Sequence, residues 1–177
     1  MTNFTERMVR AARLDVALYE EVEADTNALG QAMGVVLLSS IAAGLGSITQ
    51  GGMGGLILIT ISALIGWYVW AYLTYFIGVK LLPEPQTQAN HIQLLRTIHF
   101  ASSPGLIRVV GLIPGLTGIV FLIASIWMLV AMVIAVCQAL DYTSTLRAIG
   151  VCVPGWVIHV FPQMLLFAIV GSPPAPA

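Results

Sequence analysis

Long apolar runs alternate with short polar segments along this chain of 177 residues. The apolar runs cover about residues 29–48, 56–79, 116–140 and 148–170. Each run is close to or above the roughly 20 residues that a helix needs to cross a hydrocarbon core about 30 Å thick. The connections within the first pair and within the second pair are short, which favours antiparallel neighbours. The pattern predicts an all-α integral membrane protein with four transmembrane helices in two hairpins.

The stretch between the two predicted hairpins, about residues 98–115, is apolar but interrupted by proline and glycine. A short helix is expected to begin at Asn90 and to end before Pro104, because asparagine caps helices and proline breaks them. The apolar run around Arg108 has about eight residues, too few to span a bilayer. We expect a partly re-entrant or interfacial connector, with a fifth full span as the alternative.

The first 28 residues are a separate polar segment. Apolar side chains recur every three or four positions from Phe4 to Tyr19, which predicts one amphipathic helix from Thr5 to about Asn27. Its first half is basic and its second half acidic. The helix is expected either to lie in the membrane interface or to be solvated and pack on a partner or on loops of this chain. Charges at these positions do not fit a signal peptide, so the segment should be retained.

Composition and charge agree with a membrane protein. Hydrophobic residues make up 58% and charged residues 8% of the chain, against about 25% charged residues in soluble domains. A net charge of −1 without a basic stripe argues against a nucleic-acid binder. Residues 1–28 should form a cytoplasmic helix, residues 29–171 the transmembrane domain and residues 172–177 a disordered tail.

Basic residues in the loops predict the orientation in the membrane. With four spans, one side holds every lysine and arginine except Arg147, including Lys80 and Arg108. Both termini are then cytoplasmic, and the compact chain fits a prokaryotic cytoplasmic (inner) membrane. A fifth span would place the C-terminus outside.

Small residues recur at helical spacing in the first apolar run, namely Gly30 with Gly34 and Ser40 with Gly44. Such pairs let helix backbones approach closely in lipid. We expect a tight helix contact here, either within the chain or between copies of it.

Aromatic residues crowd into the second half of the second run, at Trp67, Tyr68, Trp70, Tyr72 and Tyr75. Tryptophan and tyrosine are enriched at membrane interfaces, so these residues are expected to form an interfacial belt. A groove for a pigment, a quinone or a lipid is the alternative.

Candidate chemistry is sparse. His159 is the ionisable residue near the middle of a predicted span, so it is a weak candidate for cofactor ligation or transport. The simpler interpretation is a neutral histidine that is hydrogen-bonded to a neighbouring helix. Cys137 and Cys152 form no metal motif, and His91 and His99 have no further ligand at suitable spacing. We expect no catalytic residue, no metal and no cofactor. Asp141 and Arg147 are expected to pair across their turn.

Two motifs carry a resemblance to a known family. The first is R-T-I-H-F-A-S-S-P-G-L-I-R-V-V-G-L-I-P-G at residues 96–115, and the second is a tryptophan-bearing span followed by A-L-D-Y-T-S-T-L-R-A at residues 139–148. Over residues 10–170 the chain resembles the Yip1 domain family of polytopic membrane proteins. The resemblance implies a membrane protein without enzymatic activity. Small GTPases associate with eukaryotic members, but this chain has a short N-terminal segment and lacks a D-L-Y-G-P type motif, so GTPase binding is not expected.

Three classes of function remain. A structural or accessory subunit, packed with other membrane proteins in the lipid bilayer, fits the small-residue pairs and the apolar spans best. A small transporter or channel, or a membrane-organising protein of the Yip1 type, is the alternative. A membrane-embedded enzyme lacks the clustered acids and bases that it would need.

Overall fold

The computed structural model describes residues 3–87 and 90–170, except for side chains near the end of the last helix: His159, Gln163, Leu166, Phe167, Ile169 and Val170. The predicted tail at residues 172–177 lies outside the described part. All the regular structure in the described ranges is helical: α1 Phe4–Ala12, α2 Val16–Ala24, α3 Ala28–Gly46, α4 Ile48–Tyr75, the π-helix η1 Phe76–Leu81, α5 His91–Phe100, the 3-10 helix η2 Ser103–Leu112, α6 Thr117–Ala139 and α7 Thr145–Val170.

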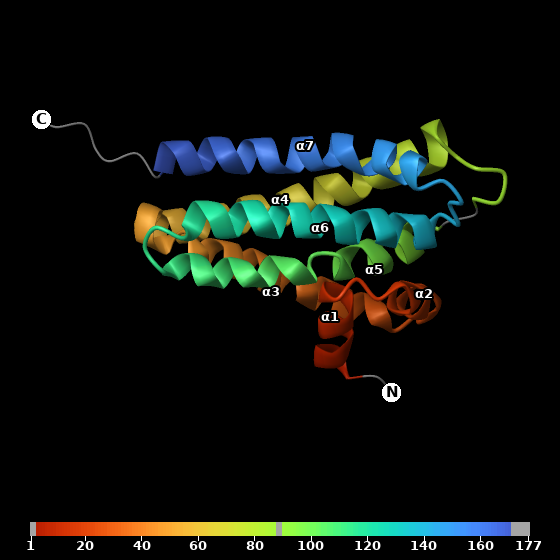
Figure 1. The fold of residues 1–177 in the computed structure, drawn as a ribbon, viewed down its shortest axis with the longest axis horizontal. Coiled ribbons are helices and arrows are strands. Elements are labelled where there is room, and N and C mark those ends of the chain that lie inside the picture. The colour runs from red at the N-terminus through yellow and green to blue at the C-terminus, as the bar shows by residue number, and fades with distance from the viewer. Residues whose placement is uncertain (1–2, 88–89, 171–177) are drawn as a thin grey trace, which may run out of the picture.

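Four helical segments of the described chain are long and apolar enough to cross a membrane. They are α3, α4 continued by η1, α6, and α7 as far as Pro162. Each coincides with one of the apolar runs. Helix α4 packs against both α3 and α7, and η2 packs against both α3 and α6. The contacts therefore join the four segments into one bundle (Figure 1).

The N-terminal segment is two helices, not the single helix that its apolar periodicity predicts. Leu14 adopts a left-handed φ of 64° between α1 and α2. The side chain of Asp15 caps α2 by accepting from the Ala17 amide at 3.1 Å and pairs with Arg10 at 2.7 Å. A side chain that satisfies a free amide favours a new helix start at this point.

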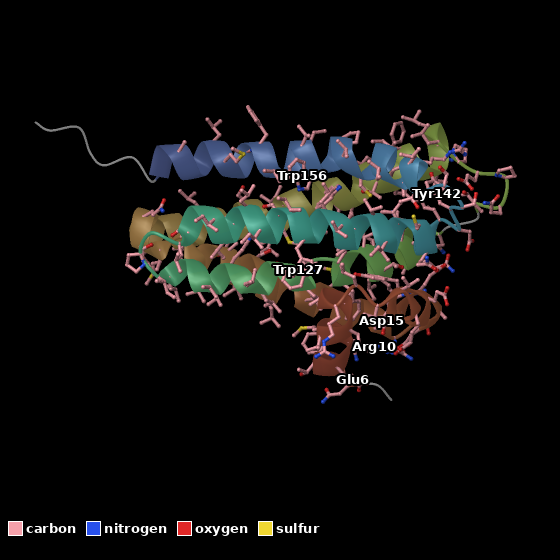
Figure 2. The ribbon with its side chains drawn as sticks, in the orientation of Figure 1. Glu6, Arg10, Asp15, Trp127, Tyr142 and Trp156 are labelled. Atoms are coloured by element: carbon pink, nitrogen blue, oxygen red, sulfur yellow. The ribbon has the colours of Figure 1, made fainter. Side chains whose placement is uncertain are left out.

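Ion pairs hold α1 against α2 and α3. Arg7 is buried and contacts Glu21 at 2.9 Å and Asp25 at 2.8 Å, and it donates to Gln31 at 3.0 Å. Arg10 contacts Glu21 at 2.6 Å. Figure 2 shows Arg10 and Asp15 close together below the bundle. These two arginines are therefore bound to carboxylates of the same chain, whereas interfacial binding would require them to face lipid head groups.

The segment α5–η2 passes from one end of the bundle to the other. Its start lies at the end of α4, where the rings of Tyr75 and His91 are 5.0 Å apart. Its end lies at the start of α6, where the Thr117 hydroxyl donates to the Gly111 carbonyl at 3.0 Å. Since α6 starts at the far end of the bundle from α4's last turn, the segment does not turn back. The segment therefore runs along the length of the bundle as two short helical pieces, whereas a re-entrant connector would return to the end at which it began.

The path of α5–η2 changes which loops share an end of the bundle. The loop before α5 and the loop after α6 meet, because the Tyr142 hydroxyl donates to the carbonyls of Gly78 at 2.8 Å and Leu82 at 2.7 Å. Arg147 lies 3.8 Å from Glu84, whereas the sequence pattern predicts a pair with Asp141. Figure 1 shows α1 and α2 below the right-hand half of the bundle, whereas α7 runs to its left-hand end.

Candidate functional site

Three glycines position η2 against α3. A Cβ atom at Gly46 would lie 2.0 Å from the Arg108 carbonyl oxygen, and one at Gly105 would lie 2.1 Å from Ser39 Oγ. A Cβ atom at Gly111 would lie 2.7 Å from the Gly46 carbonyl. Small residues therefore allow the backbones of η2 and α3 to touch, which fixes the place from which Arg108 extends.

Arg108 is the charged side chain that this packing buries. Only 2% of it is exposed. Its Nη2 donates to Ser125 Oγ at 3.1 Å, and its guanidinium carbon lies 5.3 Å from the centroid of the Phe121 ring. Nε has no hydrogen-bond partner in the described structure, and none of the ion pairs between described residues involves Arg108. The charge is met by one hydroxyl and one aromatic face.

The guanidinium lies deep along α6. Ser125 is eight residues after Thr117, the first residue of α6, which corresponds to a rise of about 12 Å. A charged side chain at the centre of a spanning helix costs roughly 3 kcal/mol on insertion scales. An arginine held at this depth without a carboxylate needs a physical reason, so it is the strongest candidate for a functional residue in the described chain.

A cavity of about 320 Å³ lies beside Arg108. Arg108, Ser125 and Trp156 supply its polar groups, and apolar residues of α4, α6 and α7, the aromatic Phe121 among them, supply the rest of the wall. Trp156 Nε1 donates to the Ser125 carbonyl at 3.3 Å, and Figure 2 shows Trp156 on α7 at the side facing α6. Leu122 and Met164 are largely exposed at the rim. The cavity is thus an apolar space with one cation in its wall, open between α6 and α7.

A second hollow of about 420 Å³ lies between α4 and α7. Its lining is almost entirely aliphatic, with the Ser62 hydroxyl as the polar side-chain group and no charged residue. This hollow offers shape but no acid, base or ligand for a metal.

The small residues singled out in the sequence have different surroundings. A Cβ atom at Gly44 would lie 2.1 Å from Thr60 Oγ1 and 2.7 Å from the Leu56 carbonyl, so α3 and α4 touch there. Ser40 is buried on the same helix. Gly34 faces the ring of Phe4 in α1 at 3.5 Å, and Gly30 has no neighbouring atom within 4 Å of the Cβ position. The close contact involves the second half of α3 only.

The aromatic residues predicted as an interfacial belt divide between two faces of α4. Trp67 and Trp70 are buried, with ring centroids 4.9 Å apart. Tyr68 and Tyr72 are exposed on the outside, and Tyr75 meets His91 edge to face. The two tryptophans are core residues rather than belt residues, because α7 packs over them: a Cβ atom at Gly155 would lie 2.1 Å from the Trp70 ring.

The remaining candidates form no site. The side chain of His159 lies outside the described residues. His99 is buried and His91 contacts Tyr75, and within the described ranges no three metal-binding side chains come together. Cys137 and Cys152 are free thiols.

Sequence reasoning overlooked Arg108 as a site residue, because it counted this arginine among the loop charges. A signal was available, since Arg108 is the one charged residue between Pro104 and Leu140. An ionisable residue in so long an apolar stretch is a functional hypothesis by default.

No family model, curated protein or solved structure matches this chain. The resemblance to the Yip1 domain family therefore stays a prediction from the two motifs that carry it.

Proposed function

We propose that this chain is a non-enzymatic integral membrane protein that serves as a structural or accessory subunit of a larger membrane assembly. The observation that carries the proposal is the aliphatic hollow between α4 and α7, with Ser62 in its wall. Lipid tails are as apolar as the helices, so no hydrophobic force drives helices together in a membrane. Helices associate instead where small residues leave a surface on which another helix packs closely. We expect side chains on a spanning helix of a partner protein to fill this hollow.

The arrangement in the membrane follows from five passes, namely α3, α4, α5–η2, α6 and α7. Arg7, Arg10, Arg13, Lys80, Arg96 and Arg147 then belong to one side, and Arg108 is the one basic residue elsewhere in the described chain. The basic side is cytoplasmic by the positive-inside rule. In this topology α1 and α2 are cytoplasmic, whereas α7 ends on the opposite side, in contrast to the four-span arrangement with both termini inside. A prokaryotic inner membrane remains the proposed location, and a membrane-organising role of the Yip1 type remains within this proposal.

Gentle-detergent purification of the tagged full chain from its native membrane tests the proposal, with native mass and identification of the co-purifying chains. The variant Ser62→Phe fills the hollow, whereas Ile57→Phe places the same side chain at an exposed position of α4 outside it. We expect a stoichiometric partner with the wild-type chain and with Ile57→Phe, and its loss with Ser62→Phe. A monomer in all three preparations would contradict the role of accessory subunit.

A small transporter is the second candidate, favoured by the burial of Arg108 beside a cavity. Transport requires access to the site from both sides of the membrane in turn. Uptake of a charged solute into vesicles that contain the purified chain, abolished by Arg108→Gln, would support this alternative.

A further inference from the structure

We propose that the cavity beside Arg108 binds a single-chain acidic amphiphile, with its phosphate or carboxylate head on the guanidinium and its hydrocarbon chain between α6 and α7. This inference is independent of the proposed accessory role, because it concerns a lipid-sized ligand rather than a protein partner. Three properties of the cavity support the proposal: its charge, its size and its opening.

The charge calls for an anion. Arg108 is 2% exposed, and its described hydrogen bond goes to the neutral Ser125 hydroxyl. A guanidinium has five N–H donors in a planar fork that matches two oxygens of a carboxylate or a phosphate. Nε lacks a partner within the described chain. An oxyanion in the cavity would supply the missing negative charge and an acceptor for the guanidinium where it lines the cavity.

The size of the cavity calls for one chain. At about 320 Å³, it lies near the lower end of the roughly 300–1,000 Å³ typical of small-molecule pockets. It can hold an oxyanion and the first part of one hydrocarbon chain, but not the glycerol and two chains of a phospholipid. Apart from Arg108, Ser125 and Trp156, the wall is apolar, as a hydrocarbon chain requires.

The opening calls for a ligand that comes from the bilayer. Leu122 on α6 is 60% exposed and Met164 on α7 is 66% exposed, and both line the cavity. Their exposed apolar faces belong in lipid, so the mouth opens sideways toward the hydrocarbon. A free inorganic anion would have to cross that hydrocarbon, whereas an amphiphile reaches the site by diffusing within the membrane.

Binding is tested with the full chain in nanodiscs of phosphatidylcholine, a lipid without net charge. The probe is a dodecyl phosphate brominated along its chain, because bromine quenches tryptophan fluorescence on contact and Trp156 lines the cavity. We expect saturable quenching that unlabelled dodecyl phosphate reverses and that an equal concentration of inorganic phosphate leaves unchanged. Brominated dodecanol, which has the chain without the charge, should give only weak quenching that does not saturate.

Two variants locate the binding to this cavity. Arg108→Gln should weaken binding at least tenfold, as expected for the loss of a charge-assisted contact. Gly118→Leu keeps the arginine and fills the cavity, since no atom lies within 4 Å of its Cβ position, and it should also abolish saturable quenching. Gly54→Leu is the matched control: this glycine on α4 also has open space around it, and the variant should bind like the wild-type chain. The Gly118 variant keeps the test valid if Arg108→Gln fails to fold.

The proposal is overturned if dodecanol quenches like dodecyl phosphate, if inorganic phosphate competes at the same concentration, or if both cavity variants bind normally. It is also overturned if the wild-type chain shows no saturable quenching and co-purifies instead with a protein chain that Arg108→Gln releases. In that case a carboxylate of a partner helix is the counter-ion.

Discussion

Glu84 connects two loops through one carboxylate. It accepts hydrogen bonds from the Thr143 amide at 3.0 Å, the Thr143 hydroxyl at 2.8 Å and Gln86 Nε2 at 2.7 Å. The Thr143 amide is the main cause that holds the pKa of the Glu84 carboxyl below its ordinary value. Because the hydrogen bonds favour the ionised form, Glu84 ties the loop after η1 to the loop after α6 only while it is charged.

This bonding predicts that the contribution of Glu84 to stability depends on pH. Its pKa is lower in the folded chain than in the unfolded chain, so the contribution is complete above the ordinary glutamate pKa of about 4.3 and is lost as the pH falls through the lower folded value. Glu84→Gln should therefore lower the melting temperature at pH 7, and the difference from wild type should shrink below about pH 4. Glu6→Gln, at an exposed position of α1, is the charge-matched control. A difference that stays constant from pH 7 to pH 3 would refute the role of the charge.

Gly44 and Gly30 predict opposite responses to the same substitution. A methyl group at Gly44 meets the Leu56 carbonyl and the Thr60 hydroxyl, whereas one at Gly30 meets no atom within 4 Å. Gly44→Ala should destabilise the bundle by about 1–3 kcal/mol, as overpacking does. Gly30→Ala should be neutral or stabilising by up to about 1 kcal/mol, because alanine favours a helix over glycine. Thermal unfolding in mild detergent measures both, and equal effects would show that the α3–α4 contact is not tight.

At the scale of elements, α1 and α2 are held to the bundle by buried apolar side chains, such as Leu18 and Val22, and by individual hydrogen bonds and ion pairs. Trp127 Nε1 donates to the Ala12 carbonyl at 2.9 Å, and Arg96 donates to the Glu23 carbonyl. Arg7 joins α1 to the carboxylates of Glu21 within α2 and of Asp25 directly after it. The hydrogen bond from Arg10 lowers the pKa of Asp15, and the Asn27 amide is the main cause of the lowered pKa of Asp25.

Removal of one arginine should release this pair of helices without unfolding the bundle. Arg7→Ala removes the arginine that pairs with Asp25 and one of the two arginines that pair with Glu21, which keeps Arg10; the loss of hydrogen bonds to charged groups costs about 1–3 kcal/mol. Amide exchange should then become faster in α1 and α2 and stay slow in the middle of α6. Arg13→Ala, which removes an exposed arginine of the same segment, is the control. Exchange that is unchanged in α1 after Arg7→Ala would contradict this account.

At the scale of the whole molecule, the course of α5–η2 sets which loops share an end of the bundle. The proposed five passes would place residues 20 and 145 together on one side of the membrane and residues 50 and 114 on the other. Four passes would instead place residues 50 and 145 on the same side. The two arrangements differ in the side that the loop between α6 and α7 faces.

Single cysteines at exposed positions near the ends of the bundle distinguish the two arrangements. In a chain with Cys137 and Cys152 replaced by alanine, we expect Glu20→Cys and Thr145→Cys to react only when the cytoplasmic side is open to a membrane-impermeant maleimide. Gln50→Cys should react from the opposite side. Reaction of Thr145→Cys from the same side as Gln50→Cys would indicate four spans and contradict the five-pass topology.

The sequence determined the helical spans, because length and apolar composition are local properties. The long apolar runs coincide with α3, α4, α6 and α7 to within a few residues at most ends. The start of α5 was also readable, since Asn90 and Gln93 form a capping box there. The break at Leu14 was not readable from the sequence, because the apolar periodicity continues through it. That Asp15 caps a new helix is seen only in the structure.

Only the tertiary structure decided which faces and charges meet. Trp67 and Tyr68 are neighbours in the sequence, but Trp67 is buried and Tyr68 is exposed. Hydropathy does not show that the 3-10 helix η2 continues the course of α5 to the other end of the bundle, because each piece is too short to span alone. The same packing of η2 against α3 carries Arg108 into the bundle beside Ser125. Its charge is visible in the sequence, but its depth, and the lack of an ion pair with any other described residue, result from contacts between segments distant along the chain.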